Sequence, residues 1–174
     1  MTTSHIRQNY LECVEDAVNK QINYELKASM AYMSMSTYFH RADVALDNIG
    51  DWFAAQSDEE RTHAKGLMKY QNRRGGRVVI SGMAEVEKQT FKNALEAFEY
   101  ALELEKGNNT ALLRLHDIAT KAEDKDLAVY LEDKYLSEQV ESIEEIGRFV
   151  TKLKQVGDGM GEVFFDKEII TNSS

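Results

Sequence analysis

The chain has 174 residues, 43% of them hydrophobic, so it is long enough to form one domain with a core of ordinary size. Aspartate and glutamate number 30 against 21 lysines and arginines, and the net charge of -9 argues against nucleic acid as a partner, because nucleic acid binds basic surfaces. No apolar run approaches the ~18 residues of a membrane span, so we expect no membrane partner.

The N-terminus and the cysteine content bear on the compartment. The opening stretch, MTTSHIRQNY, lacks a positive region followed by an apolar run, so we expect no signal peptide. Cys13 is the only cysteine, which excludes an intramolecular disulfide and fits a reducing compartment. We therefore expect one cytoplasmic domain over residues 1–174.

Long amphipathic helices are expected, because proline is absent and apolar residues recur at alternating three- and four-residue steps. The first stripe runs through Leu11, Val14, Val18, Ile22, Glu25, Ser29 and Tyr32. This helix ends near Phe39, and the segment HRADVALDN makes a short turn. The second stripe runs through Leu46, Ile49, Phe53, Gln56, Glu60, His63, Leu67 and Tyr70. That helix stops at Gly75-Gly76, where glycine favours termination.

The second half of the chain repeats this pattern. The third stripe runs through Phe91, Leu95, Phe98, Leu102, Glu105, Asn109, Leu112 and His116. After the short link TKAED, in which Asp124 is a candidate cap, the fourth stripe runs through Tyr135, Gln139, Ser142, Ile146, Phe149, Leu153 and Val156. Gly157-Asp158-Gly159 ends the fourth helix. Residues Gly161–Ile170 then have the composition of one further short helix, with Met160, Phe164 and Glu168 on one stripe.

The lengths of the connections predict the topology. Short links make helices one and two antiparallel, and likewise helices three and four. The link from Gly75 to Gln89 is much longer, and its ~15 residues cover ~50 Å when extended. A helix of ~30 residues is ~45 Å long, so this link can run the length of the bundle. We expect an all-α, antiparallel four-helix bundle with one long crossover between helices two and three, plus a short C-terminal fifth helix.

Each stripe carries a polar residue halfway along its helix. Glu25, Glu60, Glu105 and Gln139 share one layer of an antiparallel bundle, and His63 lies one turn from Glu60 on the same face. A lone glutamate on such a stripe is commonly a satisfied or partly exposed side chain. Three carboxylates and an imidazole at one level would repel unless a cation neutralised them, and no lysine or arginine lies on the stripes there. The layer therefore predicts a metal site.

The ligand types narrow the choice of metal. Carboxylate oxygens with one imidazole and no thiolate suit iron or manganese, although zinc also binds such a set. Only one Glu-x-x-His pair is present, because helix four has Gln139-Val140-Glu141-Ser142 at the corresponding level. An amide and a hydroxyl weaken one of two metal positions. A site with one weak metal position favours iron that binds transiently, is oxidised and is then released. It disfavours a permanently bound di-iron cofactor.

The chain resembles ferritins of the animal heavy-chain, ferroxidase-active type over nearly its whole length. The stretches that carry the resemblance are RQNY, QINYELKAS, AYMSMS, DVAL, EERTHA, QNRRGGR, LEK, LLRLH, YLSEQV and FDKE. The resemblance implies iron storage by a ferroxidase, an Fe(II):oxygen oxidoreductase. Two iron ions would be held transiently in each subunit and oxidised by dioxygen or peroxide. Ferric mineral would then collect in a cage of 24 subunits, either homo-oligomeric or mixed with related subunits.

The resemblance also implies roles for individual residues. Glu25, Glu60 and His63 would form the tighter iron position, and Glu60 would bridge to a second position held by Glu105 with Gln139 nearby. Tyr32 matches a tyrosine beside the di-iron centre, where the resemblance implies that it hydrogen-bonds a ligand carboxylate and supplies an electron. A core tyrosine with a satisfied hydroxyl and no redox role is the alternative.

Two outlying regions depart from the family pattern. Glu132 and His116 match positions in or near an iron-transit channel, but Val129 stands where the family's channel aspartate would be. Glu59 matches a mineral-nucleation position, whereas Thr62 and Lys65 replace residues that are frequently acidic.

Three other functions stay in competition with an iron-storage ferroxidase. A light-chain-like scaffold subunit would mineralise iron with little oxidase activity, and the retained Glu25, Glu60, His63 and Glu105 argue against it. A di-iron oxygenase is disfavoured by the missing second Glu-x-x-His. A purely structural bundle does not account for the buried charges.

Overall fold

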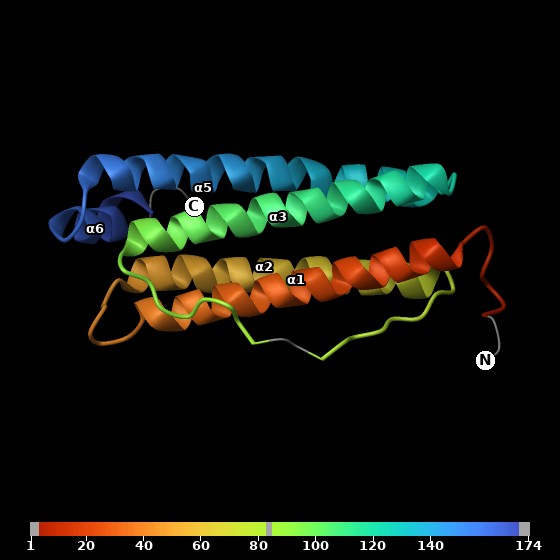
Figure 1. Ribbon diagram of the computed structural model, residues 1–174, viewed down its shortest axis with the longest axis horizontal. Helices are drawn as coiled ribbons and strands as arrows, with labels where there is room; N and C mark the ends of the chain where they lie inside the picture. The colour runs from red at the N-terminus through yellow and green to blue at the C-terminus, as the bar shows by residue number, and fades with distance from the viewer. Residues whose placement is uncertain (1–3, 83–84, 171–174) are drawn as a thin grey trace.

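Four long helical rods lie side by side along the molecule in a computed structural model that describes residues 4–82 and 85–170, apart from the side chain of Ile169 (Figure 1). The first three rods are α1 (Glu12–Phe39), α2 (Asp47–Arg73) and α3 (Ala94–Lys121). The fourth consists of α4 (Lys125–Leu131), the π-helical turn η1 (Glu132–Leu136) and α5 (Ser137–Val156). A short fifth helix follows as α6 (Met160–Phe164) and the π-helical turn η2 (Phe165–Ile169).

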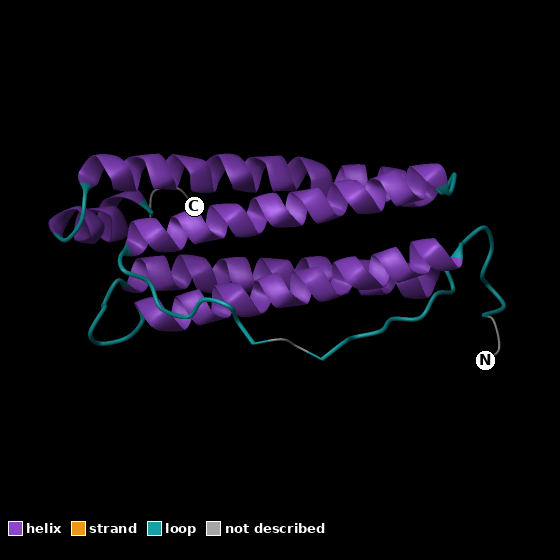
Figure 2. Cartoon of the chain, in the orientation of Figure 1, coloured by secondary structure: helices purple, strands orange, loops and turns teal. Residues whose placement is uncertain are grey.

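The described part of the chain is helix and loop without a strand, which confirms the predicted all-α class (Figure 2). The crossover after α2 runs along the outside of α1 and returns to the end of the bundle where α2 begins, so α3 is parallel to α2 (Figure 1). Residues 83 and 84 of this crossover lie outside the described residues, as do 1–3 and 171–174 of the predicted domain. None of the described helices is both long and apolar enough to cross a membrane.

Two asparagines of α1 hold the crossover against the bundle. Asn19 donates to the carbonyl of Arg77 at 2.9 Å and accepts from the amide of Val79 at 2.9 Å. Asn23, one helical turn later, donates to the Val79 carbonyl at 2.8 Å and accepts from the Ser81 amide at 2.8 Å. These side chains satisfy backbone groups that an extended segment without a partner strand would otherwise leave to water.

The helix ends match the sequence signals. The first helix ends at Phe39 as predicted, and α5 ends at Val156 before Gly157, whose φ of 75° is one that glycine adopts without strain. Asp124 accepts a hydrogen bond from the Leu127 amide at 3.1 Å and so caps α4, as predicted.

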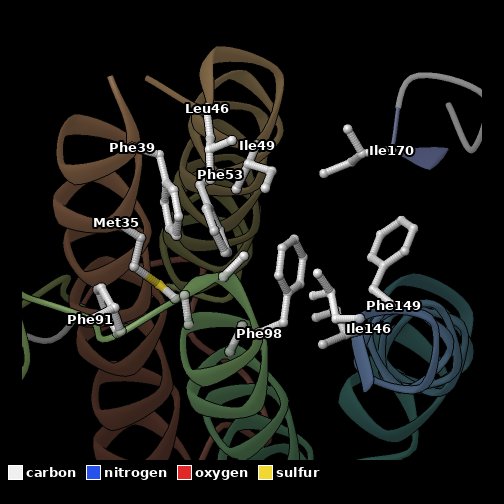
Figure 3. Packing of buried hydrophobic residues seen from close by; sticks show 14 of the residues in the cluster. Met35, Phe39, Leu46, Ile49, Phe53, Phe91, Phe98, Ile146, Phe149 and Ile170 are labelled. Carbon is white, nitrogen blue, oxygen red and sulfur yellow. The ribbon is translucent and has the colours of Figure 1, made fainter. Parts of the chain in front are cut away.

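The apolar core falls into two clusters with a polar layer between them. One contains the aromatic residues Phe39, Phe53, Phe98 and Phe149, which point into the space between α1, α2, α3 and α5 (Figure 3). The other lies toward the opposite end and includes Val18, Leu67, Leu112 and Leu131. Most of the predicted stripe residues belong to these two clusters.

Some predicted stripe positions were wrong by one residue. On α3, Asn108 and Leu115 are buried, whereas Asn109 and His116 are only half-buried. On α2, Ser57 is buried and the predicted Gln56 is only half-buried. Ser57 and Ser29 each donate to the other's backbone carbonyl at 2.7 Å. Because a helical turn takes 3.6 residues, the next residue on the same face can be three or four positions along the chain. Periodicity alone therefore does not decide between two adjacent residues.

Three other predicted stripe residues are less buried than expected. Leu11 precedes α1 and is 51% exposed. On α3, Leu95 and Leu102 are only partly buried, because small side chains face the core instead: Ala94, Ala97 and Ala101. The sequence search favoured large apolar residues, but alanines allow neighbouring helices to approach closely.

Candidate metal centre

The polar layer between the two apolar clusters contains one residue from each long helical rod. Glu25 of α1, Glu60 of α2, Glu105 of α3 and Gln139 of α5 are each 4% exposed or less. Within residues 4–82 and 85–170, the three carboxylates form no ion pair with a lysine or arginine. The predicted layer of buried, uncompensated carboxylates is therefore present at the middle of the bundle.

Three of the predicted residues form one potential ligand group. One ligand atom each of Glu25, Glu60 and His63 lies within 4.8 Å of the others, a spacing that a single cation can bridge. The Nδ1 atom of His63 is 3.8 Å from a carboxylate oxygen of Glu60, and the imidazole is 14% exposed. Glu105 is outside this group and faces a different set of partners.

Glu105 is held by two hydrogen-bond donors. The hydroxyl of Tyr32 donates to one of its carboxylate oxygens, and the Gln139 amide donates to the other. Gln139 also donates to the backbone carbonyl of Glu105 at 3.0 Å, which ties α5 to α3 at this level. Tyr32 thus donates to Glu105, one of the carboxylates that the resemblance named as candidate iron ligands.

Amides that the sequence search missed position the other carboxylates. Asn108 donates to Glu25 at 2.8 Å and lies 3.4 Å from a carboxylate oxygen of Glu60. Gln21 donates to Glu25 at 2.7 Å and to the Asn108 carbonyl oxygen at 2.7 Å. Such partners orient metal-binding side chains and tune their affinity. Placing the buried stripe of α3 one residue earlier after Glu105 would have identified Asn108 in place of Asn109.

Burial changes the pKa values of the three carboxyl groups. Burial raises the pKa of Glu25 well above its usual range, and contact with Glu60 adds to the increase. Burial, with repulsion from Glu105, raises the pKa of Glu60 to about 8. Burial also raises the pKa of Glu105, although the bonds from Tyr32 and Gln139 oppose the change. Burial is the main cause in all three groups, because it disfavours the charged form.

A second group shares the imidazole. Ligand atoms of Glu59, His63 and Glu138 lie within 4.8 Å of one another, and Nε2 of His63 is 3.4 Å from a carboxylate oxygen of Glu138. Glu138 was not predicted, because it lies one residue off the fourth stripe, beside Gln139. Thr62 and Lys65, which stand near the predicted nucleation position Glu59, are exposed.

The two candidate transit residues lie away from the polar layer. Nε2 of His116 is 2.7 Å from a carboxylate oxygen of Glu132, so these residues form a pair near the start of the fourth rod. Val129, which stands in the place of the channel aspartate, is 54% exposed.

The π-helical turn η1 lies just before the part of the fourth rod that enters the polar layer. It contains the buried Tyr135, whose hydroxyl donates to the backbone carbonyl of His63 at 2.9 Å. Single π turns often occur at functional sites, because the extra residue changes which side chains face the core. Periodicity did not predict this turn.

Comparisons with known proteins show the family of this chain. The ferritin family, described as a ferritin-like domain, matches residues 15–156. The chain is 48% identical over 174 residues to soma ferritin of Lymnaea stagnalis, covering 100% of both chains. It is 49% identical to the ferritin middle subunit of Aquarana catesbeiana, covering 98% of this chain and 99% of that one.

The chain belongs to the ferritin family. Ferritins are iron-storage proteins, and the family match extends from α1 to the end of α5. The ligand types present in this ferritin chain fit that cargo, because oxygen-rich sites with one imidazole suit iron.

Proposed function

We propose that this ferritin chain is an iron-storage ferroxidase, which oxidises Fe(II) to Fe(III) with dioxygen or peroxide and stores the product as ferric mineral. The observation that supports the proposal is the buried layer of Glu25, Glu60 and Glu105 beside His63, without a lysine or arginine partner in the described residues. A cation is the natural countercharge for such a layer.

The two iron positions would differ in strength. Glu25, Glu60 and His63 supply ligand atoms that one ion can bridge, so they would form the tighter position. Glu60 would bridge to a second ion held by Glu105, whose neighbour Gln139 brings an amide in place of a carboxylate. One weak position allows ferric product to leave.

Carboxylate ligands favour the oxidation itself. Fe(III) carries more charge than Fe(II), and hard oxygen anions stabilise the higher charge more strongly. Because burial raises the pKa values of Glu25, Glu60 and Glu105, these groups release protons as iron enters. Asn108 and Gln21 keep Glu25 oriented, and Tyr32 does the same for Glu105.

Storage would require a cage built from this chain, and we propose a shell of 24 subunits, alone or with related chains. The frog relative is named as a subunit, and the fifth helix exposes Met160 by 81% and Phe164 by 53%. Exposed apolar side chains of this size are typical of surfaces that are covered in an assembly. Sedimentation of the metal-free protein tests this, and a monomer near neutral pH would contradict it.

Aerobic addition of Fe(II) tests the oxidase activity. We expect a transient blue absorbance from a diferric species, followed by a stable ferric product. The double variant Glu60→Ala, His63→Ala should lose this rapid phase. If the double variant oxidised iron as fast as the parent, the site assignment would be wrong. If the parent bound and mineralised iron without a rapid phase, the light-chain-like scaffold function would replace the proposal.

A further inference from the structure

A line of aromatic rings leads from the candidate metal centre toward the end of α2. The ring of His63 is 5.5 Å from that of Tyr135, centroid to centroid. Tyr135 is 5.7 Å from Tyr130, and Tyr130 stacks on Tyr70 at 4.7 Å with an interplanar angle of 22°. Each ring contacts the next, so the line is continuous from a proposed ligand to Tyr70.

The hydroxyls along this line have different partners. Tyr135 donates to the backbone carbonyl of His63 at 2.9 Å, and the hydroxyls of Tyr130 and Tyr135 are 3.5 Å apart. Tyr70 donates to a carboxylate oxygen of Asp126 at 3.0 Å. Of these three phenols, only Tyr70 has a hydrogen bond to a carboxylate among the described residues.

A glycine makes room for the middle of the line. A Cβ atom on Gly66 of α2 would lie 2.6 Å from the hydroxyl of Tyr135 and 3.3 Å from that of Tyr130. Glycine inside a helix costs about 0.5–1 kcal/mol relative to alanine. Its presence here allows both hydroxyls to contact α2, so the close packing of the tyrosines depends on this position.

We propose that Tyr135, Tyr130 and Tyr70 form an electron relay that supplies one electron to the iron centre during oxidant reduction. The inference rests on the proposed ferroxidase function, which supplies the oxidant. Tyr32 donates to Glu105, and its ring stacks on Phe53 rather than on a ring of this line.

The electron count gives the relay a purpose. Reduction of dioxygen to water takes four electrons, and two Fe(II) ions supply two. Tyr70 would supply the third: its ring loses one electron, which passes through the rings of Tyr130 and Tyr135 to the partly reduced oxidant. An additional Fe(II) would supply the fourth electron, and solvent the four protons. The phenolic proton moves to Asp126, leaving a neutral tyrosyl radical and a carboxylic acid. A further Fe(II) then gives one electron to the radical and becomes Fe(III), and Asp126 returns the proton to the phenol, so four Fe(II) ions are oxidised for each dioxygen.

The proton partner explains why Tyr70 is the donor. An oxidised phenol loses its proton readily, and a carboxylate accepts it far better than a backbone carbonyl or a second phenol. Arg74 also donates a hydrogen bond to the Tyr70 oxygen, and this bond remains to stabilise the radical. Arg74 pairs with Asp124 at 2.8 Å and also lies 3.5 Å from a carboxylate oxygen of Asp126.

Radical mapping tests the relay. The metal-free protein is mixed aerobically with Fe(II) in the presence of a spin trap, and adducts are located by peptide mass spectrometry while iron oxidation is followed by absorbance. In the parent we expect an adduct on the Tyr70 peptide. Tyr130→Phe interrupts the line between Tyr70 and the centre, so it should lose that adduct while initial iron oxidation stays at the parent rate.

Two further variants make the test specific. Asp126→Asn keeps every ring but removes the proton acceptor, and should also lose the Tyr70 adduct. Tyr38→Phe is the matched control, because its ring contacts are with Phe39 and Phe91 in the other cluster, and it should keep the adduct.

The outcomes separate the relay from the ferroxidase. Iron oxidation with an adduct that survives Tyr130→Phe overturns the relay alone, as does an adduct confined to Tyr32. A parent that oxidises no iron overturns the proposed function and the relay with it.

Discussion

The side-chain amide of Asn108 donates a hydrogen bond to the carboxylate of Glu25 at 2.8 Å, joining α3 to α1 inside the polar layer. Asn108 is 1% exposed and also accepts from Gln21, so its orientation is fixed. A residue outside the proposed ligand set therefore orients the proposed ligand Glu25.

Asn108→Ala should weaken metal binding without abolishing it. Loss of such an orienting partner typically reduces metal affinity by about 10–100-fold. Competition titration with Zn(II) or Co(II), which are not oxidised by air, measures the change. Asn109→Ala is the matched control, because Asn109 is the neighbouring, half-buried residue. This variant should bind the metal with the affinity of the parent. A larger loss in Asn109→Ala would contradict the register of α3.

This pair of asparagines also marks how far the sequence predicts the site. The four midpoint residues were predictable, because a polar residue interrupted each apolar stripe at the same level. Asn108 was missed because Asn109 satisfies the same periodicity with a four-residue step. Only packing against α1 decides between them, since Asn108 has the buried partners Glu25 and Gln21.

The fold was predictable for a similar reason, with one exception. Short links, one long link and terminating glycines specify the bundle topology. The π-helical turn Glu132–Leu136 was not predictable, because nothing in the order of residues distinguishes it from a regular helix. Glu138, just after that turn, was missed with it, although its carboxylate lies 3.4 Å from His63.

The metal-free protein should lose stability as the pH rises from about 5 to about 8. The folded layer holds protons that the unfolded chain releases, because burial raises the pKa of Glu60 from its usual 4.5 to about 8. Stability falls with pH wherever the native state binds more protons. Urea unfolding at several pH values in this range measures how steeply the free energy of unfolding falls with pH.

The Glu60→Gln variant controls the pH experiment. It replaces one titrating carboxyl group with a neutral amide of similar shape, so the unfolding free energy should fall less steeply with pH. Saturation with Zn(II) should flatten the slope of the parent as well, because the cation replaces the protons. An increase in stability with pH over this range would contradict the raised pKa values.

Gln139→Glu should make the second metal position hold its ion. The Gln139 amide now donates to Glu105, and a carboxylate at this place would add a ligand. We expect more metal to remain per chain after dialysis against a weak chelator, and slower release of ferric product. Retention equal to that of the parent would show that Gln139 does not limit the second position.

Asp166→Ala should loosen the fifth helix from the bundle. Asp166 is 5% exposed, and its carboxylate accepts from the Ile49 amide at 2.8 Å, in the first turn of α2. Loss of such a cap costs about 1 kcal/mol. Hydrogen exchange at the Ile49 amide should accelerate, whereas Asp166→Asn keeps an acceptor oxygen and should protect it. Equal exchange in parent and Asp166→Ala would show that another group caps α2.

A crystal structure of the protein soaked anaerobically with Fe(II) tests the central claim most directly. We expect one ion among Glu25, Glu60 and His63, and a second, less occupied ion between Glu60 and Glu105. Electron density for iron only at surface carboxylates, with the polar layer free of metal, would contradict the account.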